Sequence, residues 1–373
     1  MQNNHKISAK MIFTSIFCML CILMFLIINF IGNIIVNDLQ HERVADKWNS
    51  EGGYAHISLY LSETEKNILK EDIGQTQNQL DAWYHGIDAK LKEASILPKE
   101  NPNARQIVYA YSATGNIHLK TDYGNVEAKA YGVGGDFFLF HQFELLYGTY
   151  FSEADLNNDK VVLDEELAWK LYGSSNIVGK YIMINEIPHL ISGVIKSEKG
   201  YFNDKAGNNL PTIYLSHDVL YESGSYYGLE AIEYLVPNPV SNFAYNIIEE
   251  FVGDRQIEII QNQNRFSVFS LYKTLLDMPI RSMGLSGITL PYWENIARAY
   301  EDILTILLVL KSVLLLIPLV IVIIFLWKKW INRKVRVGDI YLKIKDYVYS
   351  LRVKKNVRRN YKKNKGKEFE LKN

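Results

Sequence analysis

Residues 11–36 read MIFTSIFCMLCILMFLIINFIGNIIV and contain no charged side chain. A second apolar block, residues 303–327, reads ILTILLVLKSVLLLIPLVIVIIFLW and contains one charge, Lys311. Each block is longer than the ~20 residues that cross ~30 Å of hydrocarbon as a helix. The first block also exceeds the ~7–15-residue apolar core of a signal peptide, and no small-residue cleavage site follows it. The pattern therefore predicts two transmembrane helices.

The charges are divided unevenly between the segments around these helices. Residues 328–373 hold 17 Lys/Arg and 4 Asp/Glu, a net charge of about +13. Residues 37–302 hold 21 Lys/Arg and 37 Asp/Glu, a net charge of about −16. Short basic segments stay on the cytoplasmic side of a membrane. We therefore expect a plasma-membrane protein with both ends, 1–10 and 328–373, in the cytoplasm and residues 37–302 outside.

Aromatic residues flank the second apolar block. Tyr292 and Trp293 precede it, and Trp327 and Trp330 stand at its other end. Both pairs suit the aromatic belts that form where a helix meets the membrane–water interface.

The two cysteines, Cys18 and Cys21, have C-x-x-C spacing but lie inside the first apolar block. A reactive thiolate needs a polar setting, so we expect two small apolar residues and no redox site. The exported region then has no disulfide. Its length permits a hydrophobic core that is stable without one.

The exported region alternates between strand and helix patterns, which indicates an α+β domain. Residues 54–61 alternate as a strand does, and apolar spacing predicts an amphipathic helix over about 65–93 with a break at Gly74. Gly115 and Gly124 are expected to divide short strands at 106–112, 116–121 and 126–133. Further on, the sequence predicts a helix over 164–172, a hairpin of 181–184 with 188–195, strands at 161–163, 212–215 and 230–235, and a helix over 241–252. A last helix starts near Pro291 and runs into the second apolar block.

Two stretches partly match ligand-binding motifs. Residues 173–181 follow G-x-x-x-x-x-G-K-Y, one residue longer than the Walker A loop, and Tyr181 replaces the hydroxyl that holds Mg²⁺. Four side chains occupy positions 1, 3, 5 and 12 of a calcium-binding EF-hand frame, but Lys160 replaces its glycine: Asp155, Asn157, Asp159 and Glu166. A solvated acidic turn is the alternative. Because no catalytic or metal-binding motif is complete, we expect a non-enzymatic chain without cofactor or metal.

Lys311 is the ionisable residue inside an apolar block. Such residues usually face a partner or a cavity, although the lysine can also extend to the outer surface. Pro318, about two turns further on, should kink the helix. Both are candidates for an interface between helices.

The basic tail has an amphipathic stretch over residues 340–355. Apolar residues there alternate with lysines and arginines, which suits binding to the anionic lipid of the inner leaflet. Nucleic acid is not expected as a partner because the tail is tethered to the membrane.

Residues 130–197 resemble the MacB-like periplasmic core domain of ABC transporter permeases in the MacB/FtsX superfamily. The matching runs are DFF at 136–138, LLYGTYF at 145–151, VVLDEELA at 161–168, LYG at 171–173, IVGK at 177–180 and ISGVI at 191–195. The residues that carry the match are Phe138, Gly148, Phe151, Asp155, Glu166, Ala168, Gly173, Gly179, Lys180 and Gly193. The resemblance implies architectural roles for them and no catalytic residues.

The resemblance also implies a two-lobed domain, with a β-rich lobe inserted at about 130–225. Permeases of this superfamily usually carry three spans after the domain, whereas one is predicted here. We therefore expect a permease-like subunit of an ABC-type export or mechanotransmission system. Its ATPase and a permease would be separate chains, in a homo- or hetero-oligomer. A two-span sensor or surface ligand-binding protein, and a scaffold like the polysaccharide co-polymerases, share this topology and remain alternatives.

Overall fold

The computed structural model describes residues 9–49, 53–71, 73–97, 105–121, 124–152, 155, 159–278 and 290–370. Residues 1–29 with 309–373 form one unit, and residues 30–308 form another. The two units are described separately.

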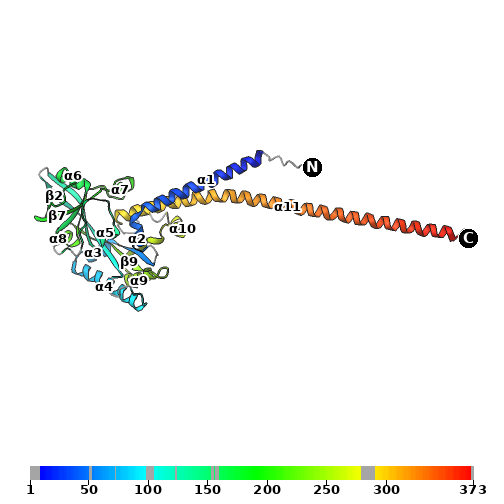
Figure 1. The fold of residues 1–373 in the computed structure, drawn as a ribbon. Coiled ribbons are helices and arrows are strands. Elements are labelled where there is room, and N and C mark those ends of the chain that lie inside the picture. Colours follow the sequence, from blue (N-terminus) through cyan, green and yellow to red (C-terminus); the bar gives the residue numbers. More distant parts are fainter. Residues whose placement is uncertain are drawn as a thin grey trace. The chain divides into compact units, whose positions relative to one another are not determined.

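A ten-stranded sheet runs through the described part of residues 30–308 (Figure 1). The strand order is β10-β1-β9-β2-β3-β8-β5-β7-β4, and β6 pairs with β7. Neighbours are antiparallel except β3 with β8 and β5 with β7. The strands are β1 (Tyr54–Leu61), β2 (Val108–Thr121), β3 (Gly124–Gly135), β4 (Leu145–Gly148), β5 (Lys160–Asp164), β6 (Tyr181–Ile184), β7 (Ile187–Ile195), β8 (Thr212–Ser216), β9 (Tyr226–Pro237) and β10 (Ile257–Gln261).

Helices pack on both faces of the sheet. On one face, α3 (Glu63–Lys70), α4 (Ile73–Glu93) and α9 (Phe243–Val252) build a core with β1, β2 and β9. On the other face, α2 (Val44–Trp48), α5 (Phe137–Phe140) and the start of α11 (Tyr292–Glu370) build another core. A further core lies under α6 (Glu165–Tyr172) and α8 (His217–Glu222), against β5, β7 and β8. The remaining helical segments are α1 (Ala9–Asp38), η1 (Gln40–Arg43), α7 (Tyr201–Lys205), η2 (Asn262–Asn264) and α10 (Val268–Asp277).

Several sequence predictions are confirmed. The strand 54–61 is β1, and the hairpin is β6–β7, where Asn185 and Glu186 adopt positive φ angles of 48° and 68° in the turn. The helix over 164–172 is α6, capped by Asp164, whose carboxylate accepts from the amide of Leu167 at 2.7 Å. The helix near Pro291 is α11, which begins at Tyr292.

The predicted division at Gly115 is wrong. β2 is continuous from Val108 to Thr121, and Gly115 lies within it at an irregularity in its pairing with β9. A Cβ atom at Gly115 would lie 2.0 Å from the carbonyl oxygen of Ser225. The glycine therefore permits a close approach between backbones and does not end a strand.

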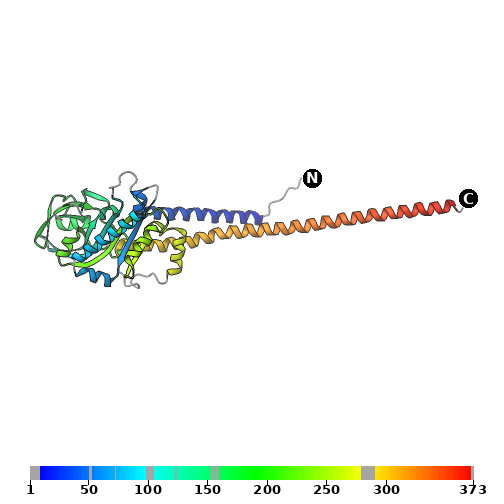
Figure 2. The same cartoon turned by 90° about the horizontal axis from the view of Figure 1, so that it is seen from below.

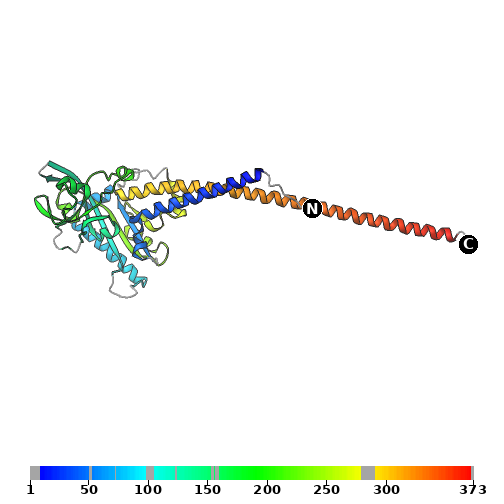
Figure 3. The same ribbon diagram turned by 45° about the horizontal axis from the view of Figure 1, so that its top comes forward.

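Two helices in the described residues are long and apolar enough to cross a membrane, over 12–38 in α1 and 292–331 in α11. The end of α1 and the start of α11 join the sheet domain next to each other (Figure 2 and Figure 3). A Cβ atom on Gly32 would lie 3.7 Å from Leu304 Cδ2, so the two helices are in contact there. The membrane boundaries of the two spans and the boundaries of the inserted lobe stay predictions.

Candidate functional site

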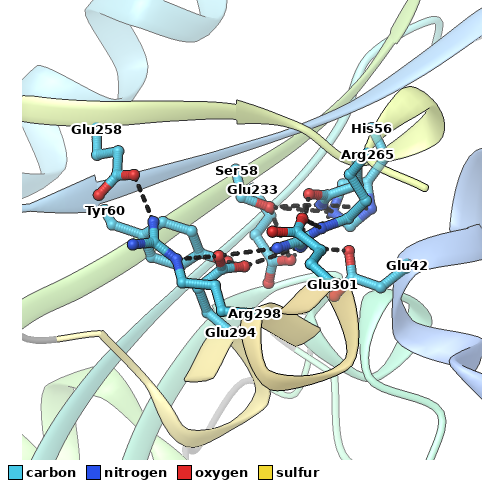
Figure 4. A network of polar contacts seen from close by, with 11 residues as sticks. Glu42, His56, Ser58, Tyr60, Glu233, Glu258, Arg265, Glu294, Arg298 and Glu301 are labelled. Atoms are coloured by element: carbon cyan, nitrogen blue, oxygen red, sulfur yellow. Dashed lines mark hydrogen bonds and ion pairs between the residues drawn. The ribbon is translucent and has the colours of Figure 1, made fainter. Parts of the chain in front are cut away.

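Arg265 directly follows η2, and its side chain is buried (Figure 4). One guanidinium nitrogen donates to Glu42 at 2.8 Å, and two nitrogens bind both oxygens of Glu294 at 2.9 and 3.0 Å. Its Nε donates to Glu301 at 2.6 Å. Glu42 follows α1, whereas the other two carboxylates lie near the start of α11. Arg265 therefore connects η1, which follows α1, and the start of α11 to the segment that follows β10.

Arg298 extends this group of charges along α11. Its Nε donates to Glu294 at 2.8 Å, and its Nη2 pairs with Glu258 on β10. The hydroxyl of Tyr60, on β1, donates to Glu294 at 3.3 Å. Glu294 has no exposed surface, so every interaction of its carboxylate is made inside the domain. We define the anchor network as Glu42, Tyr60, Glu258, Arg265, Glu294, Arg298 and Glu301.

A second polar group surrounds Glu233, which is buried on β9. One carboxylate oxygen lies 2.5 Å from His141 Nε2, and the other lies 3.0 Å from His56 Nε2. Ser58 is paired with Glu233 in the β1–β9 register, and its hydroxyl donates to the same carboxylate at 3.5 Å. Among the described residues, no three His, Cys, Asp or Glu side chains have the arrangement of a metal site.

Asn262 connects the two groups. Its amide nitrogen donates to Ser58 Oγ at 2.8 Å, and its amide oxygen accepts from Arg265 at 3.4 Å. The polar contacts therefore continue from α11 through η2 into the central strands β1 and β9. A buried network whose members are all hydrogen-bonded rigidifies its surroundings.

Aromatic packing fixes the first turn of α11 in the domain. Trp293 lies between Phe137, at 6.2 Å between ring centroids, and His141, at 4.5 Å. Tyr292 donates to Glu198 at 2.7 Å. The predicted aromatic belt is thus wrong for Tyr292 and Trp293, which are 2% and 5% exposed in the core of the domain. Their spacing before an apolar helix is the same in either role, so the sequence does not separate the two.

Neighbouring charges lower the pKa of two of these carboxylates, Glu294 and Glu233. Burial alone would raise the pKa of Glu294, but Arg265 and Arg298 reverse this and hold the pKa below its usual range. Burial likewise opposes ionisation of Glu233, and attraction by His141 and His56 holds its pKa well below the usual range. Because both pKa values are lower in the folded protein, folding favours the ionised forms.

The stability of the domain should therefore fall with acidification. An unfolded glutamate has a pKa near 4.5, so the stabilisation from Glu233 and Glu294 is present above that pH and is lost below it. Asp164 acts in the opposite direction, because burial raises its pKa to about 6. We expect the unfolding midpoint to decrease from pH 5 to pH 3, measured by tryptophan fluorescence. Glu233→Gln should flatten this decrease, and an unchanged profile in that variant would contradict the assignment.

Comparison with known protein families identifies the family of this chain. The model of the MacB-like periplasmic core domain matches residues 18–242, more than half of the chain. The chain belongs to the MacB-like periplasmic core domain family. This family provides the permease domain of ABC-type transporters.

Two curated relatives are similar in sequence to part of this chain. The pyoverdine export ATP-binding/permease protein PvdT of Pseudomonas aeruginosa is 34% identical over 96 residues, which cover 24% of this chain and 14% of that protein. The macrolide export ATP-binding/permease protein MacB of Pasteurella multocida is 34% identical over 149 residues, which cover 37% and 23%. The chain thus matches less than a quarter of the length of either relative.

Solved structures of similar domains include the periplasmic region of MacB from Actinobacillus actinomycetemcomitans. It matches with a TM-score of 0.37 and 15% identity, over 61% of this chain and 94% of that one. The extracellular domain of YknZ, a noncanonic ABC-type transporter from Gram-positive bacteria, matches with a TM-score of 0.34 and 13% identity, over 55% and 99%.

The aromatic residues of the MacB-like motif lie together. Phe138, on α5, stacks on Tyr150 at 4.5 Å and meets the edge of Phe151 at 5.2 Å. The hydroxyl of Tyr150 donates to the carbonyl of Phe143 at 2.6 Å. These contacts hold the chain before β4 and the chain after it together.

The small residues of the motif lie where backbones approach closely or turn. Gly148 and Gly193 are register partners in β4 and β7. Gly173, with φ of 65°, ends α6, and Ala168 of that helix is fully buried. Gly179 has φ of 87°, and its amide donates to the carbonyl of Ile191 at 2.9 Å. Architectural roles for these residues remain a prediction.

The charged residues of the motif make local contacts. Lys180, the lysine of the loop that partly matches Walker A, lies over the ring of Tyr172 at 4.8 Å. Asp155 pairs with Lys160 at 2.8 Å, and Glu166 pairs with Lys170 at 2.9 Å and Lys199 at 3.3 Å. Asn157 of the EF-hand-like frame lies outside the described residues.

Lys311 and Pro318 belong to the other unit, residues 1–29 with 309–373. In α11, which is continuous through Pro318, Lys311 is half-buried and Pro318 is buried. Their role at a helix interface stays a prediction.

Sequence reasoning did not find the anchor network. Its members come from segments up to 259 positions apart, Glu42 and Glu301, which meet only in the fold. One signal was available: Glu294, Arg298 and Glu301 recur at helical spacing just before an apolar block, where a charged face needs partners.

Proposed function

We propose that this chain is the permease-like membrane subunit of an ABC-type export or mechanotransmission system and that it relies on a separate ATPase. The observation that carries the proposal is the anchor network, in which Arg265 binds Glu42, in η1 just after α1, and two carboxylates near the start of α11. Separating these groups would leave charges buried without partners, which is strongly unfavourable. The end of α1 and the start of α11 therefore move with the sheet domain as one body. A movement of the helices in the membrane is then passed to the domain outside.

The family and its relatives support this role. The relatives are named as ATP-binding/permease proteins for export, and this chain matches part of each. The stretch closest to a nucleotide-binding loop has Lys180 packed on Tyr172. We propose that the chain is non-enzymatic and that an ABC ATPase in the cytoplasm supplies the energy.

The proposed placement is a plasma membrane, with both ends in the cytoplasm and the sheet domain outside. The charge difference between residues 37–302 and 328–373 supports this orientation. The basic tail then lies near anionic membrane lipid. Lys311 and Pro318 are the candidate contacts to a partner helix, in a homo- or hetero-oligomer.

Purification of the full chain from its native membranes in mild detergent tests the proposal. We expect an ABC ATPase to co-purify, identified by mass spectrometry, with ATP hydrolysis in the complex. Lys311→Leu should insert at the wild-type level, because one lysine costs ~2.5–3.5 kcal/mol and many apolar neighbours offset it. The variant should nevertheless recover less partner than the wild type. A wild-type preparation without any ATP-binding partner would overturn the proposal.

A further inference from the structure

The helix α10 exposes an apolar face on the domain. Five side chains on it are between 37% and 81% exposed: Val268, Phe269, Tyr272, Leu275 and Leu276. At about 100° per residue they occupy one continuous arc of about 120°. Lys273, Thr274 and Asp277 lie on the polar side of the helix. This is an amphipathic helix whose buried contacts use Leu271 and Thr274, so the described part of the domain leaves its apolar face uncovered.

The surroundings of α10 fix its level relative to the second span. Thr305, fully buried in α11, donates to the carbonyl of Leu271 at 3.4 Å. Thr305 is the third residue of the apolar block that begins at Ile303. Arg265, which precedes α10 in the chain, donates to Glu301, and Glu301 lies one turn before Thr305 in α11. α10 is therefore fixed beside the outer end of the second span.

The first long helix provides an independent measure of this level. Gly32 of α1 contacts Leu304. Asp38, the first charged residue after the apolar block of α1, is six residues further on, or about 9 Å along the helix. Amphipathic helices at a membrane surface bury their apolar face ~5–10 Å into the boundary between headgroups and acyl chains. The contact between α10 and α11 lies within that depth.

We propose that α10 is an interfacial helix, whose apolar face is embedded in the outer leaflet of the lipid bilayer. Figure 2 shows α10 running across the neighbouring start of α11, as a helix in the plane of the membrane would. Phe269 and Tyr272 provide the aromatic groups that favour the interface. Lys273, exposed at the edge of the apolar arc, can reach lipid phosphates. Through Arg265, this helix adds a third membrane contact to the anchor network.

Spin labelling of the full chain in lipid nanodiscs tests this inference. The chain has two cysteines, so Cys18→Ala with Cys21→Ala gives a background for single labels. Nitroxides are placed by Phe269→Cys and Leu276→Cys on the apolar arc. Lys273→Cys is the control on the same helix. Trp169→Cys, 55% exposed on α6, is the control on a helix that packs away from the two long helices.

For each nitroxide, the rate of collision with oxygen, which partitions into lipid, is compared with the rate of collision with a water-soluble nickel chelate. We expect the oxygen-to-nickel ratio at residues 269 and 276 to exceed that at residue 169 by about threefold or more, with residue 273 between them. Equal ratios at residues 269 and 169 would mean that the face meets water, and would overturn the inference. Protection of residues 269 and 276 from both reagents would also overturn it, because protein would then cover the face.

Discussion

Replacing Arg265 by methionine is expected to lower the thermal unfolding midpoint of the full chain by about 6–20 °C. The variant leaves three buried carboxylates, of Glu42, Glu294 and Glu301, without the cation that they share. Breaking a buried ion pair by removing one partner costs ~3–5 kcal/mol. For a domain of this size, each kcal/mol corresponds to ~2–4 °C in the midpoint. Tryptophan fluorescence in detergent micelles measures the change.

Two further variants separate the network from a general effect of lost charge. Lys90→Met removes a surface cation that pairs with Glu250 at 3.0 Å, and it should leave the midpoint within about 2 °C. Arg265→Lys keeps the charge but cannot bind three carboxylates through a planar fork, so an intermediate midpoint is expected. If Arg265→Met matched Lys90→Met, the anchor network would not hold the helices to the domain.

Such a network contributes more to the specificity of the helix positions than to stability. A buried ion pair gains little stability over apolar residues of similar volume, because desolvation opposes the attraction. Its hydrogen bonds, however, specify which groups meet. Glu294 binds two guanidinium groups and a phenol from β1, so a small rotation of α11 would break several bonds together. Such a connection suits the transfer of movement between helices and sheet that we propose for this chain.

The elements that sequence predicted well are those with strong local signals. Asp164 and Gly173 mark the two ends of α6, and the turn of the β6–β7 hairpin lies at Asn185 and Glu186. Gly115 misled the prediction because a glycine that ends a strand and one that admits a neighbouring backbone look the same in sequence. The order of the strands in the sheet could not be predicted from the sequence, since β1 lies between β9 and β10, strands about 170 to 200 residues away.

Less of the candidate site could be predicted from the sequence. The residues at 294, 298 and 301 were visible as a charged face, but their partners Arg265 and Glu42 carry no local pattern. Tyr292 and Trp293 fitted both a membrane interface and a protein core. The family resemblance was readable because its motif is local, and it covers the strands and turns of residues 130–197 and not the network.

Gly148→Ala tests whether a glycine of that motif is architectural. Gly148 has a φ of 78°, which costs an L-residue ~1–2 kcal/mol. A Cβ atom there would also lie 2.1 Å from the carbonyl oxygen of Ser192, so β4 would have to move away from β7. Overpacking of this kind typically costs a further ~1–3 kcal/mol. We expect a total loss of about 2–5 kcal/mol, and a lower midpoint of thermal unfolding.

Gly173→Ala is the matched control. Its φ of 65° is close to that of Gly148, but no atom lies within 4 Å of the position where its Cβ would be. The control therefore carries the backbone strain without the collision, and its loss should stay near ~1–2 kcal/mol. The difference between the two variants measures the close approach of β4 to β7 alone. Equal losses would show that Gly148 is needed for its positive φ angle and not for the close approach of β4 to β7.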